Sequence, residues 1–265
     1  MKIKILAAAA LATVAALGTA SAADLPMPAP AYKAPLPPPP VYNWTGCYVG
    51  GGGGYAMWTQ NSFVTANGTP ITASQSNGGN GWFGQGQVGC DYQFTAPFFG
   101  VQTVIGAFGD FAGGSITGSS SFPGFTGGEK ESSTWAVGGR AGVLVTPRFL
   151  TYFDGGYTQA RFDGVNYNIA LAGGGASGLS LAAQTYNGWF LGSGFEYAFD
   201  WLPIPGLFLK TEYRYSQYGG NNGTSVPLTG SVVGIPVTGA ALNSQKATQF
   251  ISTELVWRFN WFGHY

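Results

Sequence analysis

Leu209-Lys210-Thr211-Glu212-Tyr213-Arg214-Tyr215 alternates charged residues with aromatic and uncharged ones. The stretch from Glu254 to Trp261 repeats this alternation. Successive side chains of a β-strand point to opposite faces, so each stretch predicts a strand with one charged face and one apolar face. Of all residues, 8% are charged and 15% are aromatic. This combination favours a closed barrel with lipid outside and a polar interior, while a soluble β-sandwich that buries the same apolar face is the alternative.

The N-terminal residues predict export. Lys2 and Lys4 precede an apolar run over residues 5–17, and Ala20-Ser21-Ala22 supplies small residues for cleavage. These are the parts of a secretory signal peptide, so we expect residues 1–22 to be removed. The alternative is an uncleaved membrane helix, for which the run is rather short. Residues 23–43 are Pro-rich, which favours an extended periplasmic leader or, alternatively, a tether to the cell wall or a partner.

Residues 44–265 alternate with period two, and we assign them to one all-β domain, an up-and-down outer-membrane barrel. Connections after the second, fourth and sixth predicted strands are short and contain Pro, whereas the others are polar and roughly 20–30 residues long. Short turns on one side and long loops on the other are typical of such barrels, with both termini periplasmic. The eight antiparallel strands are predicted near residues 44–58, 80–94, 98–112, 132–146, 149–161, 187–200, 206–218 and 247–262.

Charged residues gather on one parity of the predicted strands. An eight-stranded barrel has an interior just wide enough for its own side chains, so an unpaired charge there is costly. We therefore expect these charges to pair with one another in a structural network, with glycines on the same face leaving room for long side chains. The predicted lumen charge network consists of Asp91, Asp110, Arg140, Asp154, Glu196, Lys210, Glu212, Arg214, Glu254 and Arg258.

Aromatic residues gather on the opposite parity, in two groups along the strands. Amphipathic rings favour the headgroup region of a bilayer, so the groups predict two interfacial girdles. The group near the long loops contains Tyr55, Trp82, Trp135, Tyr157, Trp189 and Tyr215. The group near the short turns contains Tyr92, Phe94, Phe99, Phe149, Tyr197, Phe199, Phe259 and Trp261, with Trp257 on the same parity of the last strand.

Cys47 and Cys90 are the two cysteines of the chain. Pairing the first two predicted strands about their loop sets Cys47 opposite Cys90 and Val49 opposite Val88. In the oxidising periplasm this register predicts a disulfide, with two unbridged cysteines as the alternative. Two cysteines and the single His264 do not make a metal site, and we expect no cofactor.

Several motifs carry a resemblance to a known family. They are residues 44–51, with the sequence WTGCYVGG, residues 86–92, with GQVGCDY, the stretch Ala23-Asp24-Leu25-Pro26, and residues 210–215. The chain resembles the porin-like immunogenic outer-membrane proteins of alphaproteobacteria, which are small OmpA-type barrel surface antigens. The resemblance implies an eight-stranded, surface-exposed barrel in the outer membrane. Such barrels usually end in Phe, whereas here residues 260–265 follow Phe259, so the terminal aromatic for assembly is either Phe259 or Tyr265.

Three functional classes fit this outline. We expect a structural surface protein with a largely plugged, salt-bridged lumen that contributes to envelope integrity and surface presentation. A porin with a narrow pore for small solutes is the alternative. We do not expect an enzyme, since hydrolysis of lipid needs a Ser with a positioned base and His264 lies in the terminal tail. The expected partners are outer-membrane lipid and lipopolysaccharide, the barrel-assembly machinery and an extracellular ligand at the loops, with no nucleic acid.

Overall fold

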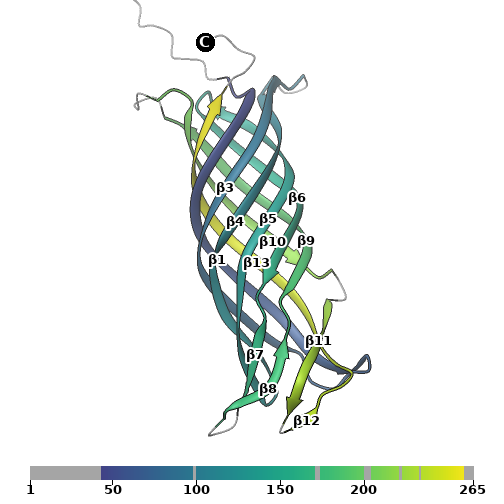
Figure 1. Ribbon diagram of the computed structural model, residues 1–265. Coiled ribbons are helices and arrows are strands. Elements are labelled where there is room, and N and C mark those ends of the chain that lie inside the picture. The colour runs from purple at the N-terminus through teal and green to yellow at the C-terminus, as the bar shows by residue number, and fades with distance from the viewer. Residues whose placement is uncertain are drawn as a thin grey trace, which may run out of the picture. The chain divides into compact units, whose positions relative to one another are not determined.

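The computed structural model describes residues 43–97, 100–170, 174–199, 204–220, 223–232 and 234–259. The predicted signal peptide and nearly all of the Pro-rich leader lie outside these residues, as do Phe99, Trp261, His264 and Tyr265. The described residues form β-strands joined by turns and short connections (Figure 1). None of them belongs to a helix of the length and hydrophobicity needed to cross a membrane.

Eight long strands alternate up and down and are joined side by side in one antiparallel sheet. They are β1 (Gly46–Ala66), β3 (Gln75–Thr95), β4 (Gln102–Phe122), β5 (Phe125–Thr146), β6 (Phe149–Phe162), β9 (Gln184–Ala198), β10 (Leu207–Tyr218) and β13 (Ala240–Phe259). Five short strands accompany them: β2 (Thr69–Pro70), β7 (Val165–Ile169), β8 (Ala176–Leu181), β11 (Thr224–Val232) and β12 (Ile235–Pro236).

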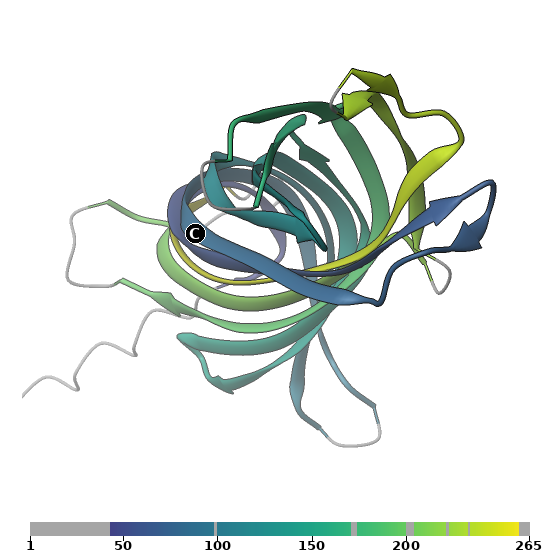
Figure 2. The same cartoon turned by 90° about the horizontal axis from the view of Figure 1, so that it is seen from below.

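The eight long strands close into a ring. Neighbours pair in the order β1, β3, β4, β5, β6, β9, β10 and β13, and β13 pairs back with β1 from Cys47↔Phe259 to Ala66↔Ala240. Figure 2, which looks along the strands, shows them arranged around a common centre. We call this arrangement the eight-strand ring. Because it is closed, its long strands leave no long unpaired edge along their shared length.

The two ends of the ring differ. The connections from β3 to β4, from β5 to β6 and from β9 to β10 lie at one end, which we call the turn end. At the opposite, loop end lie β7, β8, β11 and β12 (Figure 1). The predicted short turns therefore lie together at one end. The predicted register of the first hairpin is also confirmed, since Cys47 faces Cys90 and Val49 faces Val88.

The predicted loops after the first and third strands are wrong, because the strands continue through them. β1 and β3 remain paired up to Ser62↔Gln75, and β4 meets β5 at Phe122↔Phe125 across a tight turn. Gly124 has a φ of +87° in this turn, a conformation that favours glycine. Ile116 and Ser120 are buried on the inner face of β4 and alternate with small exposed residues. Small residues give a weak hydrophobic signal, so the alternation is hard to detect in the sequence.

Candidate functional site

The interior of the eight-strand ring is filled by charged side chains set among aromatic rings. On β10, Lys210, Glu212 and Arg214 point inward and are almost completely buried, whereas Tyr213 is exposed on the outer face. The inner faces of the neighbouring strands β9 and β13 add Glu196, Glu254 and Arg258. The alternation in the sequence thus becomes a polar interior and an apolar exterior.

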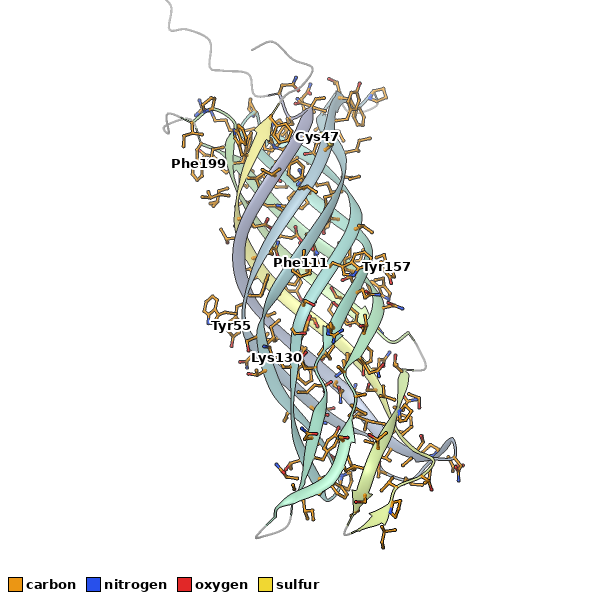
Figure 3. All side chains as sticks on the ribbon, in the orientation of Figure 1. Cys47, Tyr55, Phe111, Lys130, Tyr157 and Phe199 are labelled. Atoms are coloured by element: carbon orange, nitrogen blue, oxygen red, sulfur yellow. A yellow bond between two sulfur atoms is a disulfide. The ribbon has the colours of Figure 1, made fainter. Side chains whose placement is uncertain are left out.

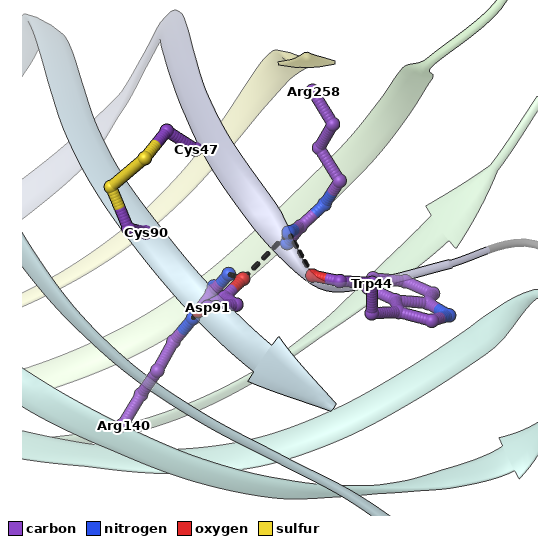
Figure 4. Close-up of a disulfide and its surroundings, with 6 residues drawn as sticks. All are labelled: Trp44, Cys47, Cys90, Asp91, Arg140 and Arg258. Carbon is purple, nitrogen blue, oxygen red and sulfur yellow. Dashed lines mark hydrogen bonds and ion pairs between the residues drawn. A yellow bond between two sulfur atoms is a disulfide. The ribbon is translucent and has the colours of Figure 1, made fainter. Parts of the chain in front are cut away.

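Four charges form a cluster near the turn end, and Figure 4 shows three of them, Asp91, Arg140 and Arg258. The Arg140 guanidinium binds Asp91 and also Glu196, with a distance of 2.5 Å between Nη1 and Oε1. The Arg258 guanidinium binds the same two carboxylates at 2.6 Å each. We call these four residues the turn-end cluster. Each charge has two partners of opposite sign, so the cluster is neutral as a whole.

Aromatic rings support both guanidiniums of this cluster. Arg140 Cζ lies 4.7 Å from the centre of the Tyr48 ring and 5.1 Å from that of Tyr152. Arg258 Cζ lies 4.8 Å from the centre of the Trp44 ring, and Trp44 is itself completely buried. A cation over a ring face is stabilised by the ring quadrupole, more strongly where water is excluded. The sequence predicted outward aromatics and did not predict these inward ones.

A second cluster, the central cluster, lies further along the ring. Lys210 Nζ binds Glu212 at 2.7 Å and lies 3.6 Å from Glu254. Arg214 binds Asp110 at 2.8 Å through Nη1 and Glu212 at 2.7 Å through Nη2. The Arg214 guanidinium also lies over the Phe190 ring, 4.3 Å from its centre. The geometry brings these five charged residues together into one connected network.

Asp154 departs from the expectation that every inward charge is paired. Its carboxyl group is buried and lies beside the Glu212 carboxyl group, and it accepts no hydrogen bond from any cation that the structure describes. No ion pair within the described part of the chain includes it, because Arg214 and Lys210 are bound to other acids. We count Asp154 as a sixth member of the central cluster, which then holds four carboxyl groups, on Asp110, Asp154, Glu212 and Glu254, and two cations, on Lys210 and Arg214.

Two inward glycines make room for this packing. A Cβ atom added at Gly138 would lie 2.7 Å from Phe190 Cζ, and one added at Gly194 would lie 2.5 Å from Tyr152 Oη. Real Cβ atoms do not approach other atoms so closely. Glycine at these positions leaves room for the Phe190 and Tyr152 rings, which lie over the guanidiniums of Arg214 and Arg140.

A third cluster, the outer cluster, lies toward the loop end and was missed by the sequence analysis. Lys246 Nζ binds Glu129 Oε1 at 2.6 Å and also contacts Gln60. Glu131 accepts hydrogen bonds from Thr134 at 2.6 Å and from Thr248 at 3.1 Å. Residues 113–131 had been predicted as a loop, which hid both acids. Lys246 lies an even number of residues from Glu254 and Arg258, and this alternation would have predicted that it points into the interior.

An apolar cluster lies in the interior at the loop end. Its buried members are Val64, Phe122, Val165, Tyr167, Leu179, Leu181, Val226, Leu228 and Leu242. They come from the long strands and from β7, β8 and β11. The Tyr167 hydroxyl lies 3.2 Å from Ser120 Oγ, and burial raises the pKa of Tyr167 to about 12. The predicted long loops thus include strands that pack over the ring.

The exterior carries the predicted aromatic residues (Figure 3). Toward the loop end they form cross-strand pairs, with ring centres 5.1 Å apart for Tyr55 and Trp82, 5.5 Å for Trp135 and Tyr157, and 5.9 Å for Trp189 and Tyr215. Toward the turn end, contacts join Tyr92 to Phe94, Phe149 and Phe199 to Tyr197, and Trp257 to Phe259.

The exterior also carries the disulfide. Cys47 and Cys90 are bonded to each other near the turn end of β1 and β3 (Figure 4). Asp91 follows Cys90 directly and points inward to the turn-end cluster. The covalent bond therefore joins the two strands beside the residue that binds both arginines.

Comparisons with known proteins agree with this architecture. The model of the outer membrane protein beta-barrel domain matches residues 7–239. The chain is 33% identical over 194 residues to the 31 kDa outer-membrane immunogenic protein of Brucella melitensis biotype 1, which covers 69% of this chain and 74% of that protein. The protein of the same description from Brucella suis biovar 1 gives the same values.

Solved structures are similar at lower levels. The outer membrane protease OmpT from Escherichia coli gives a TM-score of 0.41 at 11% identity, over 81% of this chain and 97% of that one. The outer membrane protein OprG from Pseudomonas aeruginosa gives a TM-score of 0.40 at 12% identity, over 81% and 97%. The family match over most of the sequence and the identity to the Brucella proteins establish that the chain belongs to the outer-membrane proteins with a β-barrel domain and is located in the outer membrane.

Proposed function

We propose that the eight-strand ring is a transmembrane barrel that crosses the outer membrane between its two groups of exterior aromatic residues. Trp82 and Tyr92 lie on β3 at a separation that matches the roughly 9–11 residues of a tilted membrane-spanning strand. Between the groups the outer face is apolar, with Phe153 exposed by 76% and Leu191 by 60%. In water such a surface would be costly, whereas in a bilayer it contacts hydrocarbon.

The orientation follows from the connections. In barrels of this type, short turns face the periplasm and long connections face outward. The turn end is therefore the periplasmic end, and the loop end, with β7, β8, β11 and β12, is extracellular. β1 begins and β13 ends at the turn end, since Cys47 pairs with Phe259. An even number of strands keeps both termini of the barrel on one side, and we propose that this side is the periplasm.

The packing of charged and apolar side chains inside the ring is the single observation that carries the functional proposal. The turn-end, central and outer clusters follow one another along the interior, and the apolar cluster lies beyond them. A cavity between the central and outer clusters, lined in part by Asp110, Glu131 and Arg214, has a volume of about 20 Å³. That space suits about one or two water molecules rather than a stream of solute. A plugged barrel is a membrane anchor rather than a channel.

The proposed role is structural. The barrel holds its extracellular strands and loops at the cell surface and contributes to envelope integrity through contacts with outer-membrane lipid and lipopolysaccharide. The barrel-assembly machinery and an extracellular ligand at the loops are the other proposed partners. We propose no enzymatic activity, since most carboxylates of the lumen are bound to Arg or Lys, an arrangement that suits structure more than proton transfer.

Conductance of the purified protein in a planar bilayer tests this proposal. A plugged barrel gives no steady openings in concentrated KCl. Steady, large openings would reject the plug and favour the porin alternative. The heat-dependent shift in gel mobility that folded barrels display serves as the control that the inserted protein is folded.

A further inference from the structure

A polar pocket lies on the outer face of the ring, just beyond Tyr215 toward the loop end. Its volume is about 170 Å³, and it is lined by Thr59 and Asn61 of β1, Tyr215 and Gln217 of β10, and Gln245, Lys246 and Ala247 of β13. Ala247 pairs with Thr59 on one side and with Gln217 on the other, so a small side chain separates two larger ones. This arrangement makes a recess with Ala247 at its floor.

The recess exists because β10 ends earlier than its neighbour. β10 last pairs with β13 at Tyr218↔Lys246, and β11 first pairs with it at Thr224↔Ser244. Gly219 and Gly220 both have positive φ and direct the chain away between these points. Gln245 lies at the gap, where its Nε2 donates to the Gly220 carbonyl at 3.0 Å.

The polar side chains of the recess are only partly paired within the protein: Asn61 Oδ1 accepts from Ser76 Oγ at 2.6 Å, and Gln245 donates to Gly220. On β5, β6 and β9, Gln159 accepts from Trp135 Nε1 at 2.9 Å and donates to Asn187 at 2.7 Å. In the recess, the side chains of Thr59 and Gln217 form no hydrogen bond to any residue that the structure describes. A ligand is free to use these donors and acceptors.

The side chains of the recess are neutral. The Lys246 ammonium is directed inward and binds Glu129 at 2.6 Å, so its charge is not offered to the outer surface. Amide groups both donate and accept hydrogen bonds, as sugar hydroxyls do, and the aromatic ring of Tyr215 suits the C–H face of a sugar. A phosphate group would require a cation, and the outward cations Lys130 and Arg161 lie on other strands.

We propose that this recess binds a neutral sugar ring from the headgroup of lipopolysaccharide. The inference rests on the proposed orientation, which places the recess on the extracellular side of the aromatic girdle, at the level of glycolipid sugars. The barrel would then hold a lipid neighbour by its carbohydrate through Gln217, Gln245, Asn61 and Thr59. Ring contact with Tyr215 would set the position of the sugar.

Binding of the delipidated, dephosphorylated core oligosaccharide to the folded protein in detergent micelles tests this site. We expect saturable binding that does not change with ionic strength, since no charge pair is involved. The double variant Gln217→Leu/Gln245→Leu removes the amides while keeping similar volume, and should weaken binding by roughly tenfold for the hydrogen bonds lost. Gln159→Leu, an amide at the same level but outside the recess, is the matched control and should bind like the wild type.

Two results would overturn the proposal. One is wild-type protein that does not bind the oligosaccharide, and the other is a double variant that binds it as well as the wild type does. Intact lipopolysaccharide tests recognition through phosphate instead. In that case its binding should depend on salt and be abolished by Lys130→Ala/Arg161→Ala. The Gln217→Leu/Gln245→Leu variant should then bind it like the wild type, and the recess would not be the site. Binding in micelles does not depend on whether the lumen conducts ions. A conducting lumen would therefore reject the plugged barrel and leave the oligosaccharide-binding result unchanged.

Discussion

Arg140 of β5 and Arg258 of β13 bind the same two carboxylates, those of Asp91 and Glu196. The two strands are not neighbours, since β1, β3 and β4 lie between them in the ring. The four side chains thus join distant strands across the interior. Each guanidinium also lies over the Tyr48 ring, at 4.7 Å and 4.9 Å from its centre. The four charges are embedded in a cluster of buried apolar side chains that includes Trp44, Phe208 and Val256.

Glu196→Gln is predicted to destabilise the barrel strongly. Glu196 bridges the two arginines at 2.5 Å and 2.6 Å, and its loss leaves both with a single shared carboxylate. Breaking a dry buried ion pair costs about 3–5 kcal/mol. Urea unfolding in detergent micelles should show a decrease of this order in the free energy of unfolding.

The control for this experiment is Arg161→Gln, which removes an exposed charge. Its free energy of unfolding should stay within about 0.5 kcal/mol of the wild type. A Glu196→Gln protein that unfolds at the wild-type urea concentration would mean that water in the lumen screens the turn-end cluster.

Arg214→Ala is predicted to open the lumen to cations. The Arg214 side chain binds Asp110 and Glu212 and lines the 20 Å³ cavity, so its removal enlarges that space. The central cluster then keeps four carboxyl groups and a single cation, the Lys210 ammonium, so its charge favours cations. Planar-bilayer recordings should change from silent to small openings, and the reversal potential in a KCl gradient should favour potassium over chloride.

Thr211→Ala is the matched control, because Thr211 lies on the same strand but hydrogen-bonds on the outer face to Thr253. It should remain silent in the bilayer. If Arg214→Ala is also silent while folded, the apolar cluster at the loop end closes the barrel without help from the ions.

The sequence was sufficient to predict most of the architecture because the strands are two-sided. Where large residues alternate with charges, as from Lys210 to Tyr215, a shift of one residue would place the charges on the outer face and the large apolar residues in the interior, so the face is strongly determined. Cys47 and Cys90 follow from the same register. Where residues are small, as from Gly113 to Ser121, neither face is favoured strongly and the strand was predicted as a loop.

The interior was harder to predict than the strands. Parity assigned Asp154 to the lumen, yet only three-dimensional distances reveal that Arg214 and Lys210 bind other acids instead. Tyr48 and Trp58 also point inward, although aromatics on other strands face outward. An outward ring is exposed on the exterior of the ring of strands and an inward ring contacts a guanidinium or ammonium, and composition alone does not separate these cases.

Removal of the disulfide is predicted to lower stability without changing the register. Cys47 and Cys90 are 43 residues apart, and in the chain-entropy model such a crosslink contributes about 4 kcal/mol. The hydrogen-bonded pairs from Gly46↔Asp91 to Ser62↔Gln75 still specify the hairpin. The Cys47→Ala/Cys90→Ala variant should keep its heat-dependent gel shift but lose the folded band at a lower temperature.

Reduced wild-type protein provides the comparison for this variant and should behave in the same way. A variant with no folded band at room temperature would indicate that the bond is required to set the register of β1 and β3.

Tyr167 is predicted to make the loop end sensitive to alkali. Burial raises its pKa from 10.0 to about 12, so the folded protein holds this proton where the unfolded chain has lost it. A group with a raised pKa contributes stability that is complete below its unfolded value and is lost as the pH rises through the folded value. The contribution of Tyr167 to the free energy of unfolding should therefore decline between about pH 10 and 12.

The variant Tyr167→Phe lacks this hydroxyl group. The difference between its titration and that of the wild type, followed by tyrosinate absorbance, should show one tyrosine ionising near pH 12. A difference centred on pH 10.0 would contradict burial of Tyr167 and with it the closure of the loop end.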